Sequence, residues 1–563
     1  MVMEKKKKYM LIGIIGTLIL LIGVSYAYWR LVIYQTGENE VASSCFSITL
    51  INEQNAINLQ KAYPILDEEG KKLTPYTFTV KNNCDAYASY SVNLELLETI
   101  LEENRLSSGF IKVMLDENTP MLLTENTSIE PTLDNAYEAY ELATGYLDKN
   151  EEITYNLRLW MDQDVTIEDD AMNKQLESKI TITASYIDHI PTDYERCVAE
   201  YGEDSIQCSI IANVDTTGKC PEVQEDGTVS VTDIEDTESL VCSAPDDYGT
   251  SYYYRGNVTN NYVKFAGFYW RILRVNGDES IRIIYDGTSA HANGESSEDR
   301  QIGTSVYNSS DNDNAYVGYM YGATGARTYN ETHTNTNDST IKTVVDNWYK
   351  TNIEDAGYSS YVSDTLFCND RTMFPSEEFT IDGYVTFTQD GYGQNNTNYR
   401  WGGVPQPSLS EEEYAKFLTH PNFKCIQKND RFTVADERTG NGSLSYPVAL
   451  LTTDEAYLAG GYAGEENRKY YLSTGNEYWT MTPDHFVNIE DFSNATGAYM
   501  RYVGTHGRVG LIYTVECFGD YDKCDIYDEE YGVTTSRGVR PVLNLKSDSL
   551  KSGQGTVSDP YRV

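Results

Sequence analysis

The residues best suited to acid–base catalysis, the histidines, stand singly in this chain rather than in a cluster. There are six, at His189, His291, His333, His420, His485 and His506. A general base must lie within hydrogen-bond reach of the group it deprotonates, and the sequence has neither a GxSxG turn nor a glycine-rich phosphate loop. A lone histidine such as His506, in Thr505-His506-Gly507, is typical of a surface turn. We therefore predict no catalytic site and no cofactor.

One short run carries the oxygen ligands that calcium prefers. Asp311-Asn312-Asp313-Asn314 places carboxylates and amides at alternate positions. The run lacks the glycine and the closing glutamate of a calcium-binding loop. We interpret it as a solvated turn and predict no metal site.

Tyrosine clusters are the better indication of function, because the chain has 47 tyrosines against 15 phenylalanines. Tyrosine joins a flat apolar face to a hydroxyl, a combination that binds saccharide and protein surfaces at low cost in entropy. Three clusters occur in the C-terminal half. The candidate ligand-binding residues are Tyr316, Tyr319, Tyr321, Tyr392, Trp401, Tyr499, Tyr502 and Tyr513.

Ten cysteines favour an exported protein with disulfides. Proximity in the sequence suggests five pairs, 45/84, 197/208, 220/242, 368/425 and 517/524. Zinc sites usually contain closely spaced pairs of the CxxC kind, and none occurs. The disulfide candidates are Cys45, Cys84, Cys197, Cys208, Cys220, Cys242, Cys368, Cys425, Cys517 and Cys524.

The N-terminus predicts an anchor in a lipid bilayer. Residues 1–8 end in four lysines, Lys5 to Lys8, and residues 9–33 are almost entirely apolar, which is long enough to cross a hydrocarbon core of about 30 Å. The lysines place the N-terminus in the cytoplasm and the rest of the chain outside. Alternatively, Ser25-Tyr26-Ala27 is a signal-peptidase site, and cleavage after Ala27 would release a secreted protein.

The excess of acidic residues limits the classes of molecule that the chain is expected to bind. With 43 Lys+Arg and 86 Asp+Glu, the net charge is −43. Such a surface repels phosphate backbones, so we predict no nucleic-acid binding.

Residues 42–187 are predicted to form an all-β sandwich. Five runs alternate apolar and polar residues and are rich in β-branched and aromatic types. They are Cys45 to Leu50, Tyr76 to Val80, Tyr90 to Leu94, Ile153 to Trp160 and Ile180 to Tyr186. The insertion from Pro131 to Leu147 has Leu133, Ala136, Tyr137 and Tyr140 at helical spacing, and we predict a short helix there.

Three segments in this region carry a resemblance to a known family. The runs KKLTPYTFTVKNNC, EEITYNLRLWMDQDVT and ESKITITASY, in that order, resemble the TasA/camelysin family of Gram-positive surface and biofilm-matrix proteins. The resemblance implies a jelly-roll-like domain and possible self-association through the sandwich. Camelysin is named for a proteolytic activity, but no HExxH motif is present, so peptidase function is not carried over.

Residues 188–245 are acidic, short of apolar runs and hold four of the ten cysteines. We interpret this segment as a disulfide-pinned connector without a core of its own. A long flexible spacer is the alternative.

Residues 246–563 are predicted to be an α+β module. Two apolar runs flank Asn276-Gly277-Asp278, which predicts a β-hairpin through the positive φ angles of Asn-Gly. A helix is expected to begin near Asp338 or Ser339, with Ile341, Val344, Val345 and Trp348 on its apolar face. Ser410 with Glu413, and Thr452 with Glu455, predict two capping boxes.

The same module resembles a second family. The runs YYYRGNVTNNYVKFAGFYWRILRVNGDESIRIIYDG, DTLFCNDRT, SYPVALLTTDEAYLAGG, YWTMTP and GVRPVLNL resemble a domain of unknown function of exported gut bacterial proteins. YWTMTP and GVRPVLNL are similar to parts of the C-type-lectin-like fold, which the formylglycine-generating enzymes share. Those enzymes bind copper through a cysteine pair, but we expect Cys517 and Cys524 to form a disulfide. The EPN and WND motifs of calcium-dependent lectins are absent from the module.

Three functions are compatible with these features. The first is a membrane-anchored surface protein whose lectin-like module binds an extracellular glycan or protein without catalysis. The second, implied by the TasA-like domain, is a structural subunit of an extracellular biofilm-type fibre. The third is an enzyme on the formylglycine-generating-enzyme fold. Structural roles are expected for Trp270, Trp348, Trp479, Arg540 and Pro541, and we expect Arg540 to pair with a buried acid or carbonyl.

Overall fold

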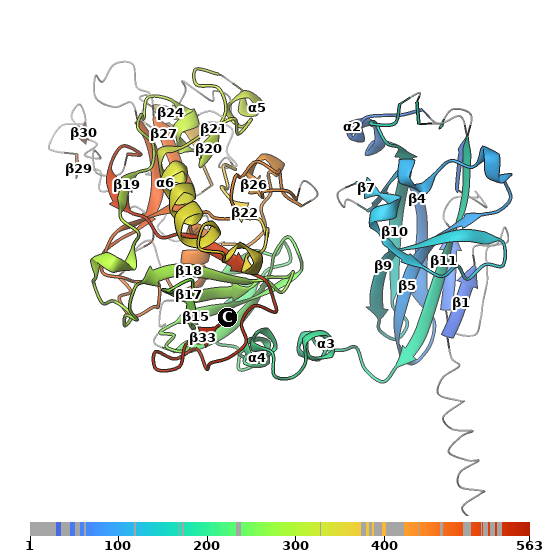
Figure 1. The fold of residues 1–563 in the computed structure, drawn as a ribbon, viewed down its shortest axis with the longest axis horizontal. Helices are drawn as coiled ribbons and strands as arrows, with labels where there is room; N and C mark the ends of the chain where they lie inside the picture. The colour runs from blue at the N-terminus through green and yellow to red at the C-terminus, as the bar shows by residue number, and fades with distance from the viewer. Residues whose placement is uncertain are drawn as a thin grey trace, which may run out of the picture. The chain divides into compact units, whose positions relative to one another are not determined.

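The structure is a computed structural model that describes residues 30–34, 46–50, 57–60, 63–116, 120–166, 168–169, 171, 174–231, 238–326, 328–372, 379–381, 385–387, 397–400, 421–436, 439–461, 466–487, 497–507, 509, 516–517, 524–525 and 532–563. The chain divides into two compact units, Met1–Thr192 and Asp193–Val563. Each has a large hydrophobic core of its own. Most of the regular structure is β-strand, with few helices (Figure 1).

Two antiparallel sheets build the first unit. The strand order is β1-β11-β5-β9-β8 in one, with β3 also paired to β11, and β2-β4-β10-β6-β7 in the other. The first sheet comprises β1 (Arg30–Tyr34), β3 (Ile57–Gln60), β5 (Tyr87–Leu97), β8 (Thr127–Ile129), β9 (Ala136–Leu147) and β11 (Gln175–Ile187). The second comprises β2 (Phe46–Leu50), β4 (Tyr76–Asn82), β6 (Ile111–Leu115), β7 (Met121–Leu122) and β10 (Glu152–Met161). Short helical turns are α2 (Asp67–Gly70), η1 (Glu102–Asn104), η2 (Ser108–Phe110) and η3 (Leu123–Glu125).

The two sheets pack around one core, as the alternating sequence predicts. Side chains along β4 alternate between buried and half-buried, because one face of the strand is turned to the core. Phe78 of β4 and Ile182 of β11 belong to the same apolar cluster. The hydroxyls of Tyr90 in β5 and Tyr155 in β10 lie 2.7 Å apart, so a hydrogen bond joins the sheets. All five predicted strands are present, and the unit is a β-sandwich.

The helix predicted between Pro131 and Leu147 is wrong, because this segment forms strand β9. Its pairing with β5 shifts register twice, between Val92 and Asn93 and between Leu96 and Leu97. Each shift is a bulge that adds one residue to β9, Leu142 in one case and Tyr137 in the other. A bulge interrupts the alternation of inward and outward side chains along a strand. The apolar residues of β9 therefore stand three or four positions apart in places, which is the spacing of a helix.

The last residues of the predicted membrane span lie in a strand of the sandwich. Residues Arg30 to Tyr34 form β1, which pairs with Ser185 to Thr181 of β11, so the end of the span predicted at residues 9–33 belongs to the sandwich. Residues 1–29 lie outside the described part of the chain. Among the described residues, no helix is both long enough and apolar enough to cross a membrane.

The first sheet of the second unit has seven strands. Its order is β14-β15-β17-β16-β33, and β18 pairs with both β17 and β32. The bounds are β14 (Ser239–Pro245), β15 (Thr250–Gly256), β16 (Tyr262–Phe265), β17 (Phe268–Val275), β18 (Ile281–Gly287), β32 (Val542–Leu545) and β33 (Tyr561–Arg562). Helix α6 (Thr340–Tyr349) packs on this sheet, where the Trp348 ring lies 5.9 Å from that of Trp270 and 5.6 Å from that of Tyr285 (Figure 1).

A five-stranded sheet and several hairpins complete the second unit. The five strands are β19 (Thr304–Val306), β31 (Ser536–Gly538), β27 (Tyr478–Val487), β25 (Thr397–Asn398) and β28 (Gly497–Val503). The two-stranded pairs are β12 (Glu222–Val223) with β13 (Val229–Ser230), β20 (Met320–Tyr321) with β21 (Asn337–Asp338), β22 (Phe367–Cys368) with β26 (Arg431–Phe432), β23 (Phe379–Ile381) with β24 (Val385–Phe387), and β29 (Glu516–Cys517) with β30 (Cys524–Asp525). The other α-helices in the described part of this unit are α3 (Asp193–Tyr201), α4 (Ile206–Ala212), α5 (Tyr329–Thr332) and α8 (Thr453–Leu458), and a π-helix, η6 (Lys350–Glu354), extends α6.

The β17–β18 hairpin is confirmed, but its turn differs from the predicted one. Asn276 N donates to Ser280 O at 2.9 Å, and the residue with positive φ is Glu279, at 63°. The connection is therefore a three-residue loop closed by a left-handed residue, not an Asn-Gly two-residue turn. The helix start at Ser339 is confirmed, because its hydroxyl accepts from Lys342 N.

Residues 193–245, within the segment expected to be a connector, share the core of the second unit. Cys197, Cys208 and Ile210 belong to the same apolar cluster as Trp270. Strand β14 pairs with β15 along its whole length. The disulfides Cys197–Cys208, Cys220–Cys242 and Cys368–Cys425 are confirmed.

Two further predicted cysteine pairs are described only in part. Cys84 is also disulfide-bonded, and its predicted partner Cys45 lies outside the described residues. Cys517 and Cys524 stand opposite each other in the β29–β30 register. The 45/84 and 517/524 pairs stay predictions.

Candidate functional site

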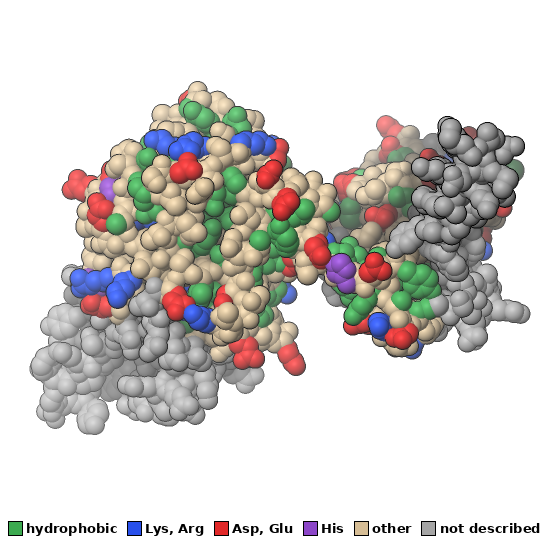
Figure 2. Space-filling view, turned by 90° about the horizontal axis from the view of Figure 1, so that it is seen from below, with side chains coloured by type: hydrophobic (Ala, Val, Ile, Leu, Met, Phe, Trp, Pro, Cys, Tyr) green, Lys and Arg blue, Asp and Glu red, His purple; other side chains and the backbone are tan. Residues whose placement is uncertain are grey.

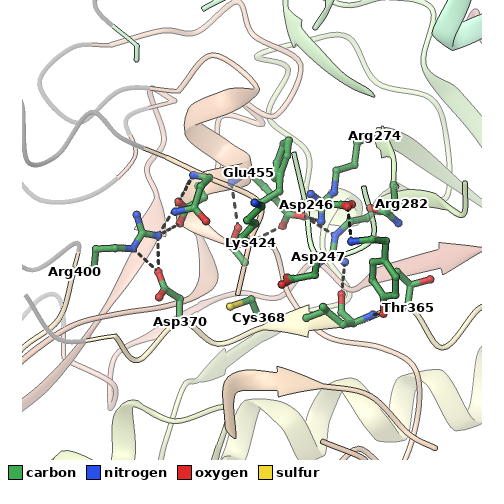
Figure 3. A pocket seen from close by; sticks show the side chains of 17 residues that line it. Asp246, Asp247, Arg274, Arg282, Thr365, Cys368, Asp370, Arg400, Lys424 and Glu455 are labelled. Carbon is green, nitrogen blue, oxygen red and sulfur yellow. Dashed lines mark hydrogen bonds and ion pairs between the residues drawn. The ribbon is translucent and has the colours of Figure 1, made fainter. Parts of the chain in front are cut away.

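A charged cleft in the second unit brings together side chains from segments far apart in the sequence (Figure 3). The space between these side chains is about 480 Å³ when the open mouth is included. The lining residues are Asp246, Asp247, Tyr248, Arg274, Asn276, Arg282, Thr365, Leu366, Cys368, Asp370, Arg400, Asn422, Phe423, Lys424, Thr452, Asp454 and Glu455.

Asp246 fixes one wall of the cleft by joining two hairpin loops. Directly after β14, its carboxylate accepts from Tyr248 N at 2.8 Å and Ser251 Oγ at 2.7 Å. It also accepts from Gly277 N, in the β17–β18 loop, at 2.9 Å. A Cβ on Gly277 would lie 2.5 Å from Asp246 Oδ1. This contact explains why glycine stands at position 277, where φ itself is not positive.

The capping box of α8 forms the floor of the cleft. Thr452 Oγ1 accepts from Glu455 N at 3.1 Å, and Glu455 Oε2 accepts from Thr452 N at 2.9 Å, as the sequence predicts. The other oxygen, Glu455 Oε1, lies 2.5 Å from Arg282 Nε and 3.5 Å from Arg274 Nη2. Glu455 therefore both starts a helix and holds two arginines that point from neighbouring strands.

Arg400 bridges two carboxylates at the other end of the cleft. Its Nη2 lies 2.5 Å from Asp370 Oδ2 and 2.6 Å from Asp454 Oδ2. Burial raises the pKa of Asp454, and the charge of Arg400 opposes this rise. Asp454 Oδ1 also accepts from Asn422 N at 2.9 Å, so the same carboxylate positions the segment that carries Phe423 and Lys424.

Arg274 differs from the other arginines of the cleft. The residue is only 7% exposed, and its guanidinium lies over the Phe423 ring, 4.0 Å from the centroid. Yet its Nε and Nη1 have no hydrogen-bond partner among the described residues. Arg282, by contrast, also donates to Leu366 O at 3.1 Å, and burial lowers its pKa to about 10, opposed by Glu455.

The cleft also contains a buried carboxylate next to its cations. Asp247 Oδ2 accepts from Cys425 N at 2.8 Å, and its Oδ1 lies 3.1 Å from Arg431 Nη2. Burial raises the pKa of Asp247, and Arg431 opposes the rise. Cys368, which lines the cleft, is bonded to Cys425. The arrangement thus offers fixed charges, donors and acceptors for a bound polar group.

The predicted tyrosine clusters lie elsewhere, and none of the described ones lines the cleft. Tyr319 is fully buried, so it has a core role. The rings of Tyr316 and Tyr321 meet edge to face at 5.5 Å. Tyr499 stacks on His485 at 4.4 Å, and the Arg537 guanidinium lies 4.0 Å from the Tyr502 ring. Tyr392, Trp401 and Tyr513 lie outside the described residues.

The run from Asp311 to Asn314 is not a solvated turn throughout, which corrects the expectation. Asp313 is buried and accepts from Ala315 N at 2.9 Å and Gly325 N at 2.5 Å. Asn314 is buried and accepts from the Tyr399 hydroxyl at 2.7 Å. These carboxylate and amide groups are engaged within the protein. Within the described residues, no group of three or more His, Cys, Asp or Glu side chains is placed to hold a metal ion.

One histidine has the neighbours of a catalytic triad but not the geometry. His291 Nε2 lies 3.3 Å from Ser289 Oγ, and its Nδ1 lies 3.3 Å from Glu295 Oε1. However, Nε2 lies closer still, at 2.8 Å, to Asp299 Oδ1. A nitrogen that donates to Asp299 cannot accept the serine proton. His291 therefore pairs with Asp299 and is not placed to act as a base on Ser289.

The lining residues of the cleft, apart from Asn276, Cys368 and the capping box, were not singled out from the sequence. The available signal was arginine inside apolar strand sequence, Arg274 in FYWRILRV and Arg282 in IRIIY. A charge in a strand that is otherwise apolar must find a partner in the interior. What the sequence does not reveal is that these partners come from residues almost two hundred positions away.

Comparison with known proteins adds no assignment, because no protein-family model and no curated protein matches the chain.

Proposed function

We propose that this chain is an exported surface protein whose second unit binds an extracellular glycan or protein in the charged cleft, without catalysis. The observation that carries the proposal is the cleft itself. Concave sites that gather a few fixed polar groups from distant segments are where proteins bind ligands. Here the strand-borne Arg274, the helix cap Glu455 and the disulfide-linked segment at Phe423 meet in one pocket.

The export part of the proposal rests on the disulfides and the N-terminal sequence. Disulfides form and persist in oxidising compartments, and three are present among the described residues. Since β1 begins at Arg30, the apolar stretch from Tyr9 to Trp29 is left for the bilayer, which is close to the roughly 20 residues a span needs. We infer a single-pass anchor with a cytoplasmic N-terminus, or a secreted form if cleavage follows Ala27.

The two family resemblances support the same assignment of roles, with ligand binding in the second unit. A TasA/camelysin-like, jelly-roll-like sandwich would stand nearer the membrane, and a C-type-lectin-like module would carry the cleft. The acidic side chains are dispersed over the face drawn in Figure 2 rather than gathered in one field, which leaves recognition to individual sites.

Blocking the cleft tests the proposal. Asn422 stands at the cleft and is half-buried, so Asn422→Trp should fill the mouth. The full chain, solubilised in detergent, is applied to glycan and protein arrays, and Asn422→Trp should lose the ligands that the unchanged chain binds. Gln554→Trp, in an exposed loop, is the matched control and should keep them. Ligands that bind the Asn422→Trp variant as well as the unchanged chain would contradict the proposal.

A subunit of an extracellular fibre is the second candidate. The observation that favours it is β1, a short strand next to the N-terminal segment that fills part of the edge of β11. A strand in this position can add to the sheet of another copy.

A further inference from the structure

The strand register of the first unit defines one end of the sandwich, which we call the base. Arg30, the first residue of β1, pairs with Ser185 of β11. On the other side of β11, Ser185 pairs with the first turn of residues in β5, and the end of β9 pairs with the same part of β5. Two loops, residues 83–86 and 148–151, connect this end of the first sheet to the second sheet. The chain therefore enters the sandwich at its base.

The apolar stretch of the N-terminus joins the base without a linker. It runs from Tyr9 to Trp29, and β1 begins at Arg30. Since a helix needs about 20 residues to cross a bilayer, a span made of this stretch leaves no residues to hold the sandwich away from the lipid. Tyr26, Tyr28 and Trp29 come last before β1, and these residue types concentrate at the boundary between water and lipid. A sandwich that begins here must stand close to the headgroups.

Large apolar side chains are exposed at the base, although the same faces of their strands are buried further along. On β11, Ile182 belongs to the core, whereas Tyr186, which shares its face, is 42% exposed. On β10, Tyr155 belongs to the core, whereas Ile153 is 36% exposed. Tyr146, near the end of β9, is also 36% exposed. The base thus presents two tyrosines and an isoleucine to its surroundings.

The charges of the base indicate which surface it suits. Lys81 pairs with Glu152 at 2.8 Å, and Lys149 with Asp85 at 3.5 Å. Acidic residues are nevertheless in excess, because Arg30, Lys81 and Lys149 stand against Asp85, Asp148, Glu151, Glu152 and Asp188. An anionic lipid surface would repel this excess. A zwitterionic surface, which carries no net charge, would not.

We propose that the base is a membrane-contacting surface, with Tyr146, Ile153 and Tyr186 in the headgroup layer of the bilayer that residues 9–29 cross. The inference rests on the anchor in the proposed function, and it adds where the first unit lies. A tyrosine ring covers apolar lipid surface while its hydroxyl remains hydrated. The Tyr186 hydroxyl lies 3.2 Å from Sγ of the disulfide-bonded Cys84, which fixes this ring at the base. Contact with lipid then holds the sandwich in one orientation on the membrane.

Photocrosslinking of the full chain in lipid vesicles tests the inference. A benzophenone amino acid replaces Tyr146, Tyr186 or Tyr63 in three separate variants, and mass spectrometry detects attached lipid. Tyr63 is the matched control, because it is 73% exposed and precedes Pro64, which bridges to Met161 at the opposite end of β10. In phosphatidylcholine vesicles, the variants at Tyr146 and Tyr186 should crosslink to lipid, and the variant at Tyr63 should not. Phosphatidylglycerol vesicles should give a lower yield, because their charge repels the acidic base.

Flotation of the unchanged chain with the vesicles separates this inference from the proposed function. A chain that floats, but crosslinks to lipid equally from Tyr146 and Tyr63, would keep the anchor and overturn the membrane contact. Crosslinks from Tyr146 and Tyr186 to protein in place of lipid would also overturn it. A chain that does not float would contradict both the anchor and this inference.

Two further outcomes are decisive. If the variant at Tyr186 fails to fold, as a melting curve would show, the variant at the exposed Tyr146 decides the test alone. A higher yield in phosphatidylglycerol than in phosphatidylcholine would contradict the zwitterionic surface inferred from the charges. Ligand binding in the cleft, measured on the arrays, is independent of all these results.

Discussion

Arg540 donates from Nη2 to Asp286 Oδ1 at 2.9 Å, and both side chains are buried. The same oxygen accepts from Arg300 Nη2 at 2.7 Å, and Arg271 Nη1 lies 3.9 Å from Asp286 Oδ2. One carboxylate thus faces three buried guanidinium groups. Arg540 also donates from Nε to Tyr285 O at 2.9 Å. The sequence-based expectation that Arg540 pairs with a buried acid or carbonyl is confirmed for both.

Removing the charge of Asp286 should destabilise the second unit strongly. Asp286→Asn leaves three buried arginines without their shared anion, and breaking a buried ion pair costs about 3–5 kcal/mol. Equilibrium urea unfolding should show this loss in the free energy of unfolding. Asp559→Asn, which breaks an exposed pair with Arg562, is the control and should change it by less than about 1 kcal/mol. Equal effects of the two substitutions would contradict the role given to Asp286.

The disulfide Cys368–Cys425 should matter for both stability and the cleft. It closes a sequence separation of 57 and joins strand β22 to the segment of Phe423 and Lys424. The entropy of a loop of this length corresponds to about 4 kcal/mol. The double variant Cys368→Ser/Cys425→Ser should lower the melting temperature and weaken ligand binding. Cys197→Ser/Cys208→Ser, with a separation of 11, should cost less stability and leave binding unchanged; the reverse order would count against this account.

The hydrogen-bonded carboxylate of Asp299 should make the loss of stability in acid steeper. Burial alone would raise the pKa of Asp299, but hydrogen bonds from Ser297 and Thr288 and the charge of His291 hold it well below its ordinary value. A carboxyl with a lowered pKa in the folded state stabilises the protein above its unfolded pKa of about 4. This contribution is lost as the pH falls through the folded-state pKa.

Asp299→Asn removes that contribution. The variant should be less stable than the unchanged chain at pH 7 and should lose less further stability between pH 5 and pH 2. Melting temperatures across this range measure both effects, with Asp559→Asn as the exposed control. A variant whose melting temperature falls as steeply in acid as that of the unchanged chain would show that Asp299 does not carry the effect.

The parts of the fold that depend on neighbouring residues could be predicted from the sequence. The caps at Ser339 and Thr452 act over three residues, and both helices begin where predicted. The alternation that predicted five strands is likewise local. By contrast, the bulges of β9 exist only in its pairing with β5, and the left-handed Glu279 only in the β17–β18 register.

The cleft could not be predicted in the same way. Arg282 and Glu455 are 2.5 Å apart in space but belong to a strand and a helix cap distant in the chain. The sequence indicates that Arg282, in an otherwise apolar strand, needs an interior partner, but it does not indicate that this partner is Glu455, whose place in a capping box already explains it locally. The tyrosine clusters were the more visible pattern, yet Tyr319 is part of the core, where its size and hydroxyl serve packing.

The N-terminal strand β1 allows a direct test between the two proposed functions, a ligand-binding surface protein and a fibre subunit. Residues Arg30 to Tyr34 pair with Ser185 to Thr181 of the same chain, so this part of the β11 edge is already filled. Unpaired edges template association, whereas filled ones do not. A chain that begins at Tyr28 should therefore remain monomeric in sedimentation velocity. A chain that begins at residue 35 exposes the edge and should self-associate, and adding a peptide of residues 28–41 should restore the monomer. The opposite result would be ordered filaments of the chain beginning at Tyr28 in negative-stain images, abolished by Leu31→Lys. In that case β1 is exchanged between copies, and a fibre subunit is the better proposal than a ligand-binding surface protein.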